Sequence, residues 1–191
     1  EEGSALRHVA AYCLMNDVSE RAFQMEHGGG TTKGKSCDTF APIGPVVVTS
    51  DELTDPHKLQ IQLRLNGTTL QNSNTKEFIF GVPHLLHFLT QVVTLEPGDL
   101  IFTGTPPGVG IARKPPILLK GGDIAEVRAD DVDRAAHRRH RQLAADREVG
   151  QEVEAGIADF LRRDIALQRR VELVPLQYVA AVVDAGEGQR L

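Results

Sequence analysis

The feature of this chain that most restricts its fold is a strict alternation of apolar and polar residues that ends in a tight-turn pair. Leucine or isoleucine occupies every second position from Leu59 to Leu65, and Asn66-Gly67 follows directly. A period of two places all these apolar side chains on one face of a strand, and Asn-Gly favours the type I′ turn of a hairpin. The sequence therefore predicts a half-buried β-hairpin whose return strand begins over residues 68–71.

Further elements are expected where apolar runs end at turn residues. We expect strands at 12–15, 46–49, 100–102 and 124–128, helices at 1–11 and 83–92, turns at 42–45, 51–58, 96–99 and 121–123, and a flexible loop or lid at 27–35. The second helix carries His84 and His87 one turn apart. This spacing can bind a metal, but without a carboxylate motif a polar edge and a packed ring are the simpler interpretation.

Polar side chains recur at helical spacing after the apolar run that ends at Asn16. Asp17, Arg21 and Gln24 stand at positions i, i+4 and i+7, so a helix starting there would carry all three on one face. A carboxylate, a guanidinium and an amide could then hold a cation beside an oxyanionic ligand. The alternative is structural, because Asp17 followed three residues later by Glu20 resembles a capping box. This stretch alone favours the capping interpretation.

Two loops add candidate ligand-binding groups. Lys35 ends the glycine-rich segment 27–35, where a solvated surface charge is the simplest interpretation. Residues 103–110, T-G-T-P-P-G-V-G, follow an apolar strand. Such a loop lets backbone amides and a threonine hydroxyl approach an anion closely, although an ordinary turn would look much the same.

The composition excludes several classes of protein. A net charge of −5 over 191 residues argues against a nucleic-acid partner, which usually requires a basic excess. No apolar run approaches the roughly 18 residues of a membrane helix, and the first residues lack a signal peptide's basic start. We therefore expect no membrane partner and a cytoplasmic location. Cys13 and Cys37 are expected to be free and reduced.

The residue usage changes abruptly after Arg128. Residues 129–191 contain no Lys, Ser, Thr or Asn, whereas all six lysines precede them, and arginine rises from five residues before this point to ten after it. Apolar spacing predicts an amphipathic helix over 149–161 and a strand or second helix over 171–183. We hypothesise that residues 129–191 are a fusion or frame-shifted tail on a domain of residues 1–128, which peptide mapping of the native gene product would test.

Five motifs, in order along residues 5–126, together resemble the C-terminal catalytic domain of the fumarylacetoacetate hydrolase family. They read Y-C-L-M-N-D-V-S-E-R-A-F-Q at 12–24, K-G-K-S-C-D-T-F-A-P-I-G-P at 33–45, L-x-L-N-G-x-x-x-Q-x-x-N-T at 63–75, L-E-P-G-D-L-I-F-T-G-T-P-P-G-V-G at 95–110 and R-K-P-P-x-x-L-K-x-G-D at 113–123. Within the family they look most like bacterial proteins named ureidoglycolate lyase or 2,4-diketo-3-deoxy sugar-acid hydrolase.

The resemblance implies a fold, a cofactor and a reaction. The fold is mixed β with few helices, a β-roll or barrel-like sandwich, to which we add a helical C-terminal tail. The cofactor is a divalent metal, Mg²⁺ or Mn²⁺, with Ca²⁺ as a further candidate. The implied enzyme is a catabolic hydrolase or lyase, a homodimer, that cleaves a C–C or C–N bond in a small 2-oxo or 2,4-dioxo acid.

The resemblance also assigns roles to particular residues. Asp17 matches the family's aspartate metal ligand, and Arg21 and Gln24 match the catalytic polar pair beside the substrate. Lys35 matches the active-site lysine, whose charge would stabilise a developing enolate or oxyanion. Thr105, with its neighbour Gly104, matches the threonine that binds the substrate carboxylate.

Two departures from the family pattern keep other functions open. The family's upstream Glu-x-Glu metal ligands and its N-terminal Glu/His pair have no counterpart, since Glu1 and Glu2 are adjacent, so we expect the domain to be incomplete at its N-terminus. The closing glycine turn of the family is also replaced at residues 129–133. A catalytically inactive fragment, acting as a ligand-binding or dimerisation module, is one alternative, and an isomerase or decarboxylase is another.

Overall fold

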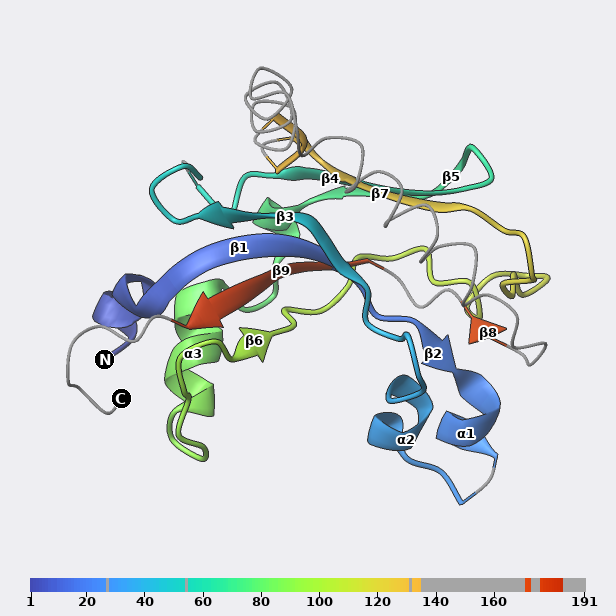
Figure 1. Cartoon of the computed structure of the whole chain (residues 1–191), viewed down its shortest axis with the longest axis horizontal. Coiled ribbons are helices and arrows are strands. Elements are labelled where there is room, and N and C mark those ends of the chain that lie inside the picture. The colour runs from blue at the N-terminus through green and yellow to red at the C-terminus, as the bar shows by residue number, and fades with distance from the viewer. Residues whose placement is uncertain (27, 54, 131, 135–170, 173–175, 184–191) are drawn as a thin grey trace, which may run out of the picture.

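The computed structural model describes residues 1–191 except 27, 54, 131, 135–170, 173–175 and 184–191 (Figure 1). Strands dominate the described part, which confirms the predicted mixed-β class with few helices. In chain order the elements are the 3-10 helix η1 (Glu2–His8), β1 (Val9–Asn16), β2 (Ser19–Glu20), α1 (Arg21–Met25), α2 (Thr31–Lys35), β3 (Ile43–Thr49), β4 (Gln60–Leu65), β5 (Thr68–Asn74), the 3-10 helix η2 (Thr75–Glu77), α3 (Val82–Leu89), β6 (Leu100–Ile101), β7 (Ala125–Ala129), β8 (Val171–Glu172) and β9 (Leu176–Val183).

Strand β1 lies inside a four-stranded sheet with the order β3-β1-β9-β6. Its neighbours β3 and β9 both run antiparallel to it, so that Cys13 is paired with Val47 on one side and Ala180 on the other. Only Ala10 of β1 is not fully buried. A strand that is buried on both faces must be almost continuously apolar, which accounts for the run V-A-A-Y-C-L-M before Asn16.

Strand β4 is the centre of a second sheet with the order β5-β4-β7. Asn66 and Gly67 adopt φ values of +50° and +78°, as a type I′ turn requires. Ile61 and Leu63 are 2% and 1% exposed, whereas the polar residues between them are more exposed. The predicted half-buried hairpin is therefore confirmed.

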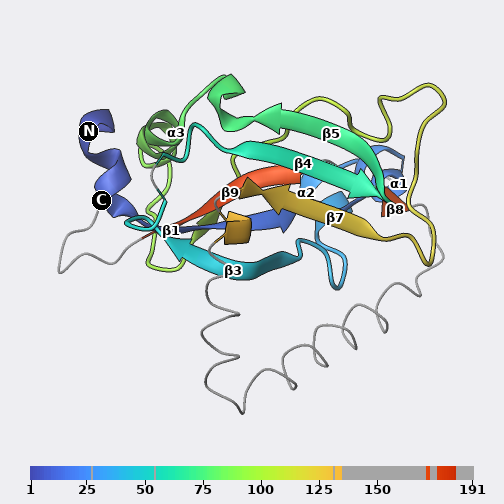
Figure 2. The same ribbon diagram turned by 90° about the horizontal axis from the view of Figure 1, so that it is seen from above.

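The two sheets stack against each other, with the main apolar core between them (Figures 1 and 2). Tyr12 and Leu14 of β1 belong to the same buried cluster as Ile61 and Leu63 of β4. Helix α3 and η1 lie together at one end of the molecule, and β2, α1, α2 and β8 lie at the other end (Figure 1). The polar segments that follow β1 therefore lie at one end of the molecule, outside the main apolar core.

Several predicted boundaries were wrong. The first helix ends at His8, because Val9 and Ala11 pair with β9 and so belong to β1. Helix α3 ends at Leu89, before the predicted residue 92. The glycine-rich segment is not all loop, because Thr31–Lys35 form α2.

The two histidines of α3 form a polar edge and a packed ring, as the simpler interpretation predicted. The His84 ring stacks on Phe80 with 4.9 Å between centroids, and its Nδ1 lies 3.7 Å from Glu2. His87 Nε2 lies 3.2 Å from the side-chain amide of Gln91. Cys13 and Cys37 form no disulfide bond, as predicted.

Part of the C-terminal region joins the sheets. Strand β9 lies between β1 and β6, and β8 pairs with β2, so segment 171–183 contributes strands and no helix in its described residues. The helix predicted over 149–161 lies outside the described residues. Ala129 and Val132 are 0% and 1% exposed, so the core continues past Arg128. Within the described residues, no helix has the length and apolar character needed to cross a membrane.

Candidate active site

Asp17 lies in the short turn between β1 and β2. Strand β1 ends at Asn16, and the amide of Val18 donates a 2.9 Å hydrogen bond to Asn16 O, which closes the turn. Asp17 is 3% exposed, and Ser19 Oγ donates to its carbonyl at 3.4 Å. The carboxylate is therefore held on short backbone at the end of a buried strand, where removal from water makes a cationic partner necessary.

Helix α1 begins later than the capping interpretation required. Its first residue is Arg21, and its N-cap is Glu20, whose Oε1 accepts from the Ala22 amide at 3.0 Å. The prediction that Asp17 caps this helix was wrong, because β2 separates the two. Arg21 Nη1 donates to Gln24 Oε1, so the predicted guanidinium and amide do meet on α1.

Lys35 is paired with Asp17 although eighteen residues separate them in the chain. The ammonium Nζ donates to Asp17 Oδ2, and the two side chains are 25% and 4% exposed. Burial lowers the pKa of Lys35 below the ordinary lysine value. The interpretation of Lys35 as a solvated surface charge was therefore wrong, since α2 carries it to the buried carboxylate.

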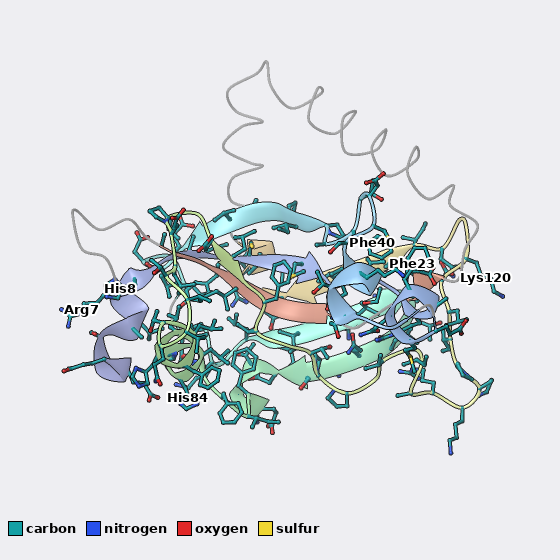
Figure 3. All side chains as sticks on the ribbon, turned by 90° about the horizontal axis from the view of Figure 1, so that it is seen from below. Arg7, His8, Phe23, Phe40, His84 and Lys120 are labelled. Atoms are coloured by element: carbon teal, nitrogen blue, oxygen red, sulfur yellow. The ribbon has the colours of Figure 1, made fainter. Side chains whose placement is uncertain are left out.

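Gly34 allows α2 to pack closely against α1 and Glu20, because it has no Cβ. A Cβ at this position would lie 2.7 Å from Gln24 Cβ and 2.9 Å from Glu20 O. Lys33 Nζ also lies 5.4 Å from the centroid of the Phe23 ring, which adds a cation–π contact between the two helices. In Figure 3, Phe23 and Phe40 lie at the end of the molecule opposite His84. We call the part formed by Asp17, α1 and α2 the α1–α2 corner; Lys35, the last residue of α2, pairs with Asp17 there.

Further oxygen atoms are buried nearby in the sequence. Asn16 Oδ1 and Glu20 Oε2 have no hydrogen-bond partner within the described part of the chain. Burial, and after it the charges of Glu20 and Asp38, raises the pKa of the Cys37 thiol, which disfavours the reactive thiolate. Sequence reasoning did not single out Glu20 as a cap, although its position before R-A-F-Q was the available signal.

Thr105 lies in the loop that follows β6, and this loop is bound to β5. Gln71 Nε2 donates to Pro106 O at 2.8 Å and lies 3.4 Å from both Thr105 Oγ1 and Pro107 O. Gly104 adopts φ +101°, in the region that favours glycine. The loop runs toward the end of the molecule that carries β2, α1 and α2 (Figures 1 and 2).

The described residues do not by themselves fit a divalent cation. They contain no group of three or more His, Cys, Asp and Glu side chains that could hold a metal ion. Mg²⁺ and Ca²⁺ take six or more oxygen ligands and usually more than one charged group. Asp17 offers one carboxylate, and that carboxylate is paired with Lys35.

A comparison with protein-family models identifies the family of this chain. Residues 1–138 match the model described as fumarylacetoacetate (FAA) hydrolase C-terminal. The chain belongs to the fumarylacetoacetate hydrolase family. Its two stacked sheets are therefore the family fold, as the five sequence motifs implied.

A curated relative and a solved structure resemble this chain over most of its length. A curated protein from Burkholderia cenocepacia, named "Putative hydrolase", is 47% identical over 144 residues, which are 74% of this chain and 51% of that protein. The fumarylacetoacetate hydrolase structure from Exiguobacterium antarcticum is 41% identical with a TM-score of 0.66, and covers 69% of this chain and 47% of that one. The chain thus spans about half the length of the curated relatives it matches.

Two further structures differ in the reaction that their names give. One is a 5-carboxymethyl-2-hydroxymuconate delta-isomerase from Mycobacterium smegmatis, 34% identical with a TM-score of 0.60, covering 69% of this chain and 48% of that one. The other is a fumarylpyruvate hydrolase from Pseudomonas aeruginosa in complex with Mn²⁺ and pyruvate. It is 30% identical with a TM-score of 0.60 and covers 69% of this chain and 55% of that one. The structures that resemble this chain thus include both a hydrolase and an isomerase by name.

Proposed function

We propose that this chain forms the oxo-acid-binding part of a hydrolase or lyase that cleaves a C–C or C–N bond in a small 2-oxo or 2,4-dioxo acid. The observation that carries the proposal is the Asp17–Lys35 pair. An ammonium and a carboxylate from segments far apart in the chain meet where both are largely withdrawn from water. Such an arrangement is costly for stability alone and typical of a site that must present a fixed positive charge.

Each candidate residue has a task that its chemistry suits. Lys35 would donate to the oxyanion or enolate that develops as the bond breaks, and Asp17 would hold the ammonium in place. Arg21 and Gln24, already hydrogen-bonded to each other, would orient the oxo end of the substrate. Thr105 and the backbone at Gly104 would bind the substrate carboxylate.

A divalent metal belongs to this proposal only with ligands from outside the described residues. The Mn²⁺ and pyruvate in the Pseudomonas aeruginosa structure support an ion of this kind in the family. With such ligands, Asp17 would be the carboxylate that the described part of the chain offers to the ion, in exchange for its pairing with Lys35, and the ion would supply Lewis-acid chemistry.

An isomerase is the second candidate. The Mycobacterium smegmatis structure named as a delta-isomerase supports it. Moving a double bond needs the same enolate stabilisation by Lys35 but no attacking water. Product analysis with a 2,4-dioxo acid separates the two reactions, because hydrolysis yields two smaller acids and isomerisation leaves the mass unchanged.

The proposal predicts that oxalate, a mimic of the 2-oxo acid end, binds to the full chain in a manner that depends on Lys35. We expect calorimetry to show oxalate binding that weakens at least tenfold in Lys35→Met, because one charge-assisted hydrogen bond is lost. Lys76→Met is the matched control, since that side chain is 67% exposed, and it should bind like the wild type.

A second titration tests the ion. Mn²⁺ binding should disappear in Asp17→Asn, and oxalate should tighten it in the wild type. Equal oxalate affinity in Lys35→Met and the wild type would contradict the proposed role of the lysine. Absence of oxalate binding to the wild type, with and without Mn²⁺, would support the inactive-fragment alternative instead.

A further inference from the structure

Gln71 is a buried polar side chain in a position where the hairpin pattern calls for an apolar one. It is the one fully buried residue of β5, at 2% exposure, and it is paired across the hairpin with Leu63, which is 1% exposed. Burying a primary amide among apolar neighbours is unfavourable unless its hydrogen bonds are made. The position therefore has a reason beyond packing.

The amide nitrogen of Gln71 points at the loop that carries Thr105. Its 2.8 Å bond to Pro106 O is the strongest of its contacts, and Pro107 O and Thr105 Oγ1 both lie at 3.4 Å. Two of these three neighbours are carbonyl oxygens that can only accept, which fixes the orientation of the side-chain amide. Pro106 O also belongs to the residue directly after Thr105, so holding this carbonyl restricts the backbone that places the threonine hydroxyl.

The loop that carries Thr105 is shaped by individual hydrogen bonds, among them Ala112 N to Val109 O at 3.2 Å and Ile117 N to Gly110 O at 3.0 Å. Residues 102–124, all of them described, contain no helix or strand. Arg113 adds a second attachment beside the first, because its Nη2 donates to Leu70 O and its Nε donates to Gly108 O at 3.2 Å. Gly108 lies so close that a Cβ there would be 2.5 Å from Leu70 O. Two consecutive residues of β5, Leu70 and Gln71, thus attach this irregular loop to the sheet.

We propose that Gln71 is a positioning residue for substrate binding: it fixes the backbone at Thr105 and Pro106, so that the Thr105 hydroxyl can exchange its long 3.4 Å contact with Pro106 O for the carboxylate of the oxo acid. The identity of the ligand in this inference rests on the proposed function. The attachment of the loop to β5 does not depend on the proposed function. Thr105 is exposed and Gln71 is buried beneath it, so the amide acts on the ligand only through the threonine.

The test is a double-mutant cycle read out by oxalate calorimetry on the full chain. Gln71→Met keeps the volume and removes the donor, and Thr105→Val removes the hydroxyl that the donor positions. We expect each single change to weaken oxalate binding about tenfold, and the double variant to bind no more weakly than Thr105→Val. The matched control is Gln60→Met on the adjacent strand, whose exposed amide donates to Asn72, and it should leave affinity unchanged.

A pH profile separates positioning from simple loss of packing. In Gln71→Glu the carboxylate cannot donate to Pro106 O, whereas the protonated acid can. Oxalate affinity of this variant, relative to the wild type at the same pH, should therefore recover as the pH falls through the titration of the new acid. Gln71→Met has no group that titrates there and should show no recovery.

Hydrogen exchange of the amides at 103–105 and 108–113 provides a readout without ligand. Gln71→Met should speed exchange of these amides at least tenfold, and Gln60→Met should not. Unchanged exchange, additive losses in the cycle, or an absence of recovery in Gln71→Glu would each overturn the inference. If the wild type does not bind oxalate, the proposed function and the role of Gln71 in substrate binding are both contradicted. Hydrogen exchange still tests whether Gln71 fixes the loop.

Discussion

The α1–α2 corner and the Thr105 loop lie toward the same end of the molecule but are built by different interactions (Figure 1). In the corner, an ionised pair joins α2 to the turn before β2, with Lys35 on the helix and Asp17 in the turn. In the loop, the neutral amide of Gln71 donates to a backbone carbonyl of the loop, and the guanidinium of Arg113 donates to a backbone carbonyl of β5. One side of the candidate site therefore depends on charge and the other on fixed geometry.

The difference indicates what each side can contribute. A partly exposed ammonium responds to a charged ligand and to ionic strength, because Coulomb interactions near the surface are screened by salt. Hydrogen bonds from Gln71 to carbonyl oxygens change little with salt, and they hold Thr105 in one orientation. Both sides also require a glycine at the closest approach, Gly34 in the corner and Gly108 in the loop.

The largest effect is expected from Gly108→Ala, which would disturb the packing of the Thr105 loop against β5. Gly108 has φ +113°, and an added Cβ would meet Leu70 O at 2.5 Å and Gln71 Cγ at 3.0 Å. Backbone strain and overpacking together should lower the free energy of unfolding by about 3 kcal/mol, measured by urea denaturation. Gly98→Ala is the control, because it has φ +91° but nothing within 4 Å, and it should cost about 1 kcal/mol. Equal losses would mean that close approach to β5 contributes nothing.

Local patterns predicted the hairpin and most strands because their evidence lies within a few residues. The alternation at 59–65 and the Asn66-Gly67 pair specify a buried face and a turn without knowledge of any other segment. The run from Tyr12 to Met15 likewise indicated a buried strand, and β1 contains it. Spacing singled out Asp17, Arg21 and Gln24, and loop context singled out Lys35 and Thr105. Their roles came from a family resemblance and stay predictions.

Contacts between distant segments could not be predicted from local pattern. Nothing in G-G-G-T-T-K-G-K indicates that Lys35 reaches Asp17, or that Gly34 is the residue that permits it, because both facts depend on how two short helices pack. Gln71 looked like an ordinary polar residue of a return strand, since its partners lie 34–36 residues away. Segment 171–183 could not be assigned to strand or helix until β9 was seen to pair with β1.

Raising the pH should weaken the α1–α2 corner before the Thr105 loop. Tyr12 also titrates at high pH, so its contribution to the free energy of unfolding must be measured separately. Burial and the charge of Asp55 raise the pKa of Tyr12 to about 12 from its ordinary 10.0. The phenol is therefore more readily ionised in the unfolded chain, so stability present below pH 10 is lost as the pH rises toward 12. The expected loss is about 2–3 kcal/mol over that window.

The matched variant is Tyr12→Phe, compared with the wild type by urea denaturation at pH 8 and at pH 11. The difference in unfolding free energy between the two pH values should be smaller in Tyr12→Phe, because no phenol titrates there. Parallel curves for both proteins would mean that the buried phenol does not limit alkaline stability. Any alkaline loss that remains in Tyr12→Phe can then be tested for dependence on Lys35.

The smallest effect is expected from Gly34→Ala, which acts on the charge side by geometry alone. The added Cβ would lie 2.7 Å from Gln24 Cβ and 3.0 Å from Gln24 N, so α1 and α2 must separate. Overpacking costs about 1–3 kcal/mol, and the better helix propensity of alanine returns about 1 kcal/mol, which leaves a loss of about 0–2 kcal/mol in urea denaturation. Gly3→Ala in η1, with nothing within 4 Å, is the control and should be neutral. Oxalate affinity should fall in Gly34→Ala more than stability suggests, because Lys35 is the next residue and moves with the helix. If affinity holds while stability falls, the position of Lys35 is set by its ion pair with Asp17 and not by the packing of α2.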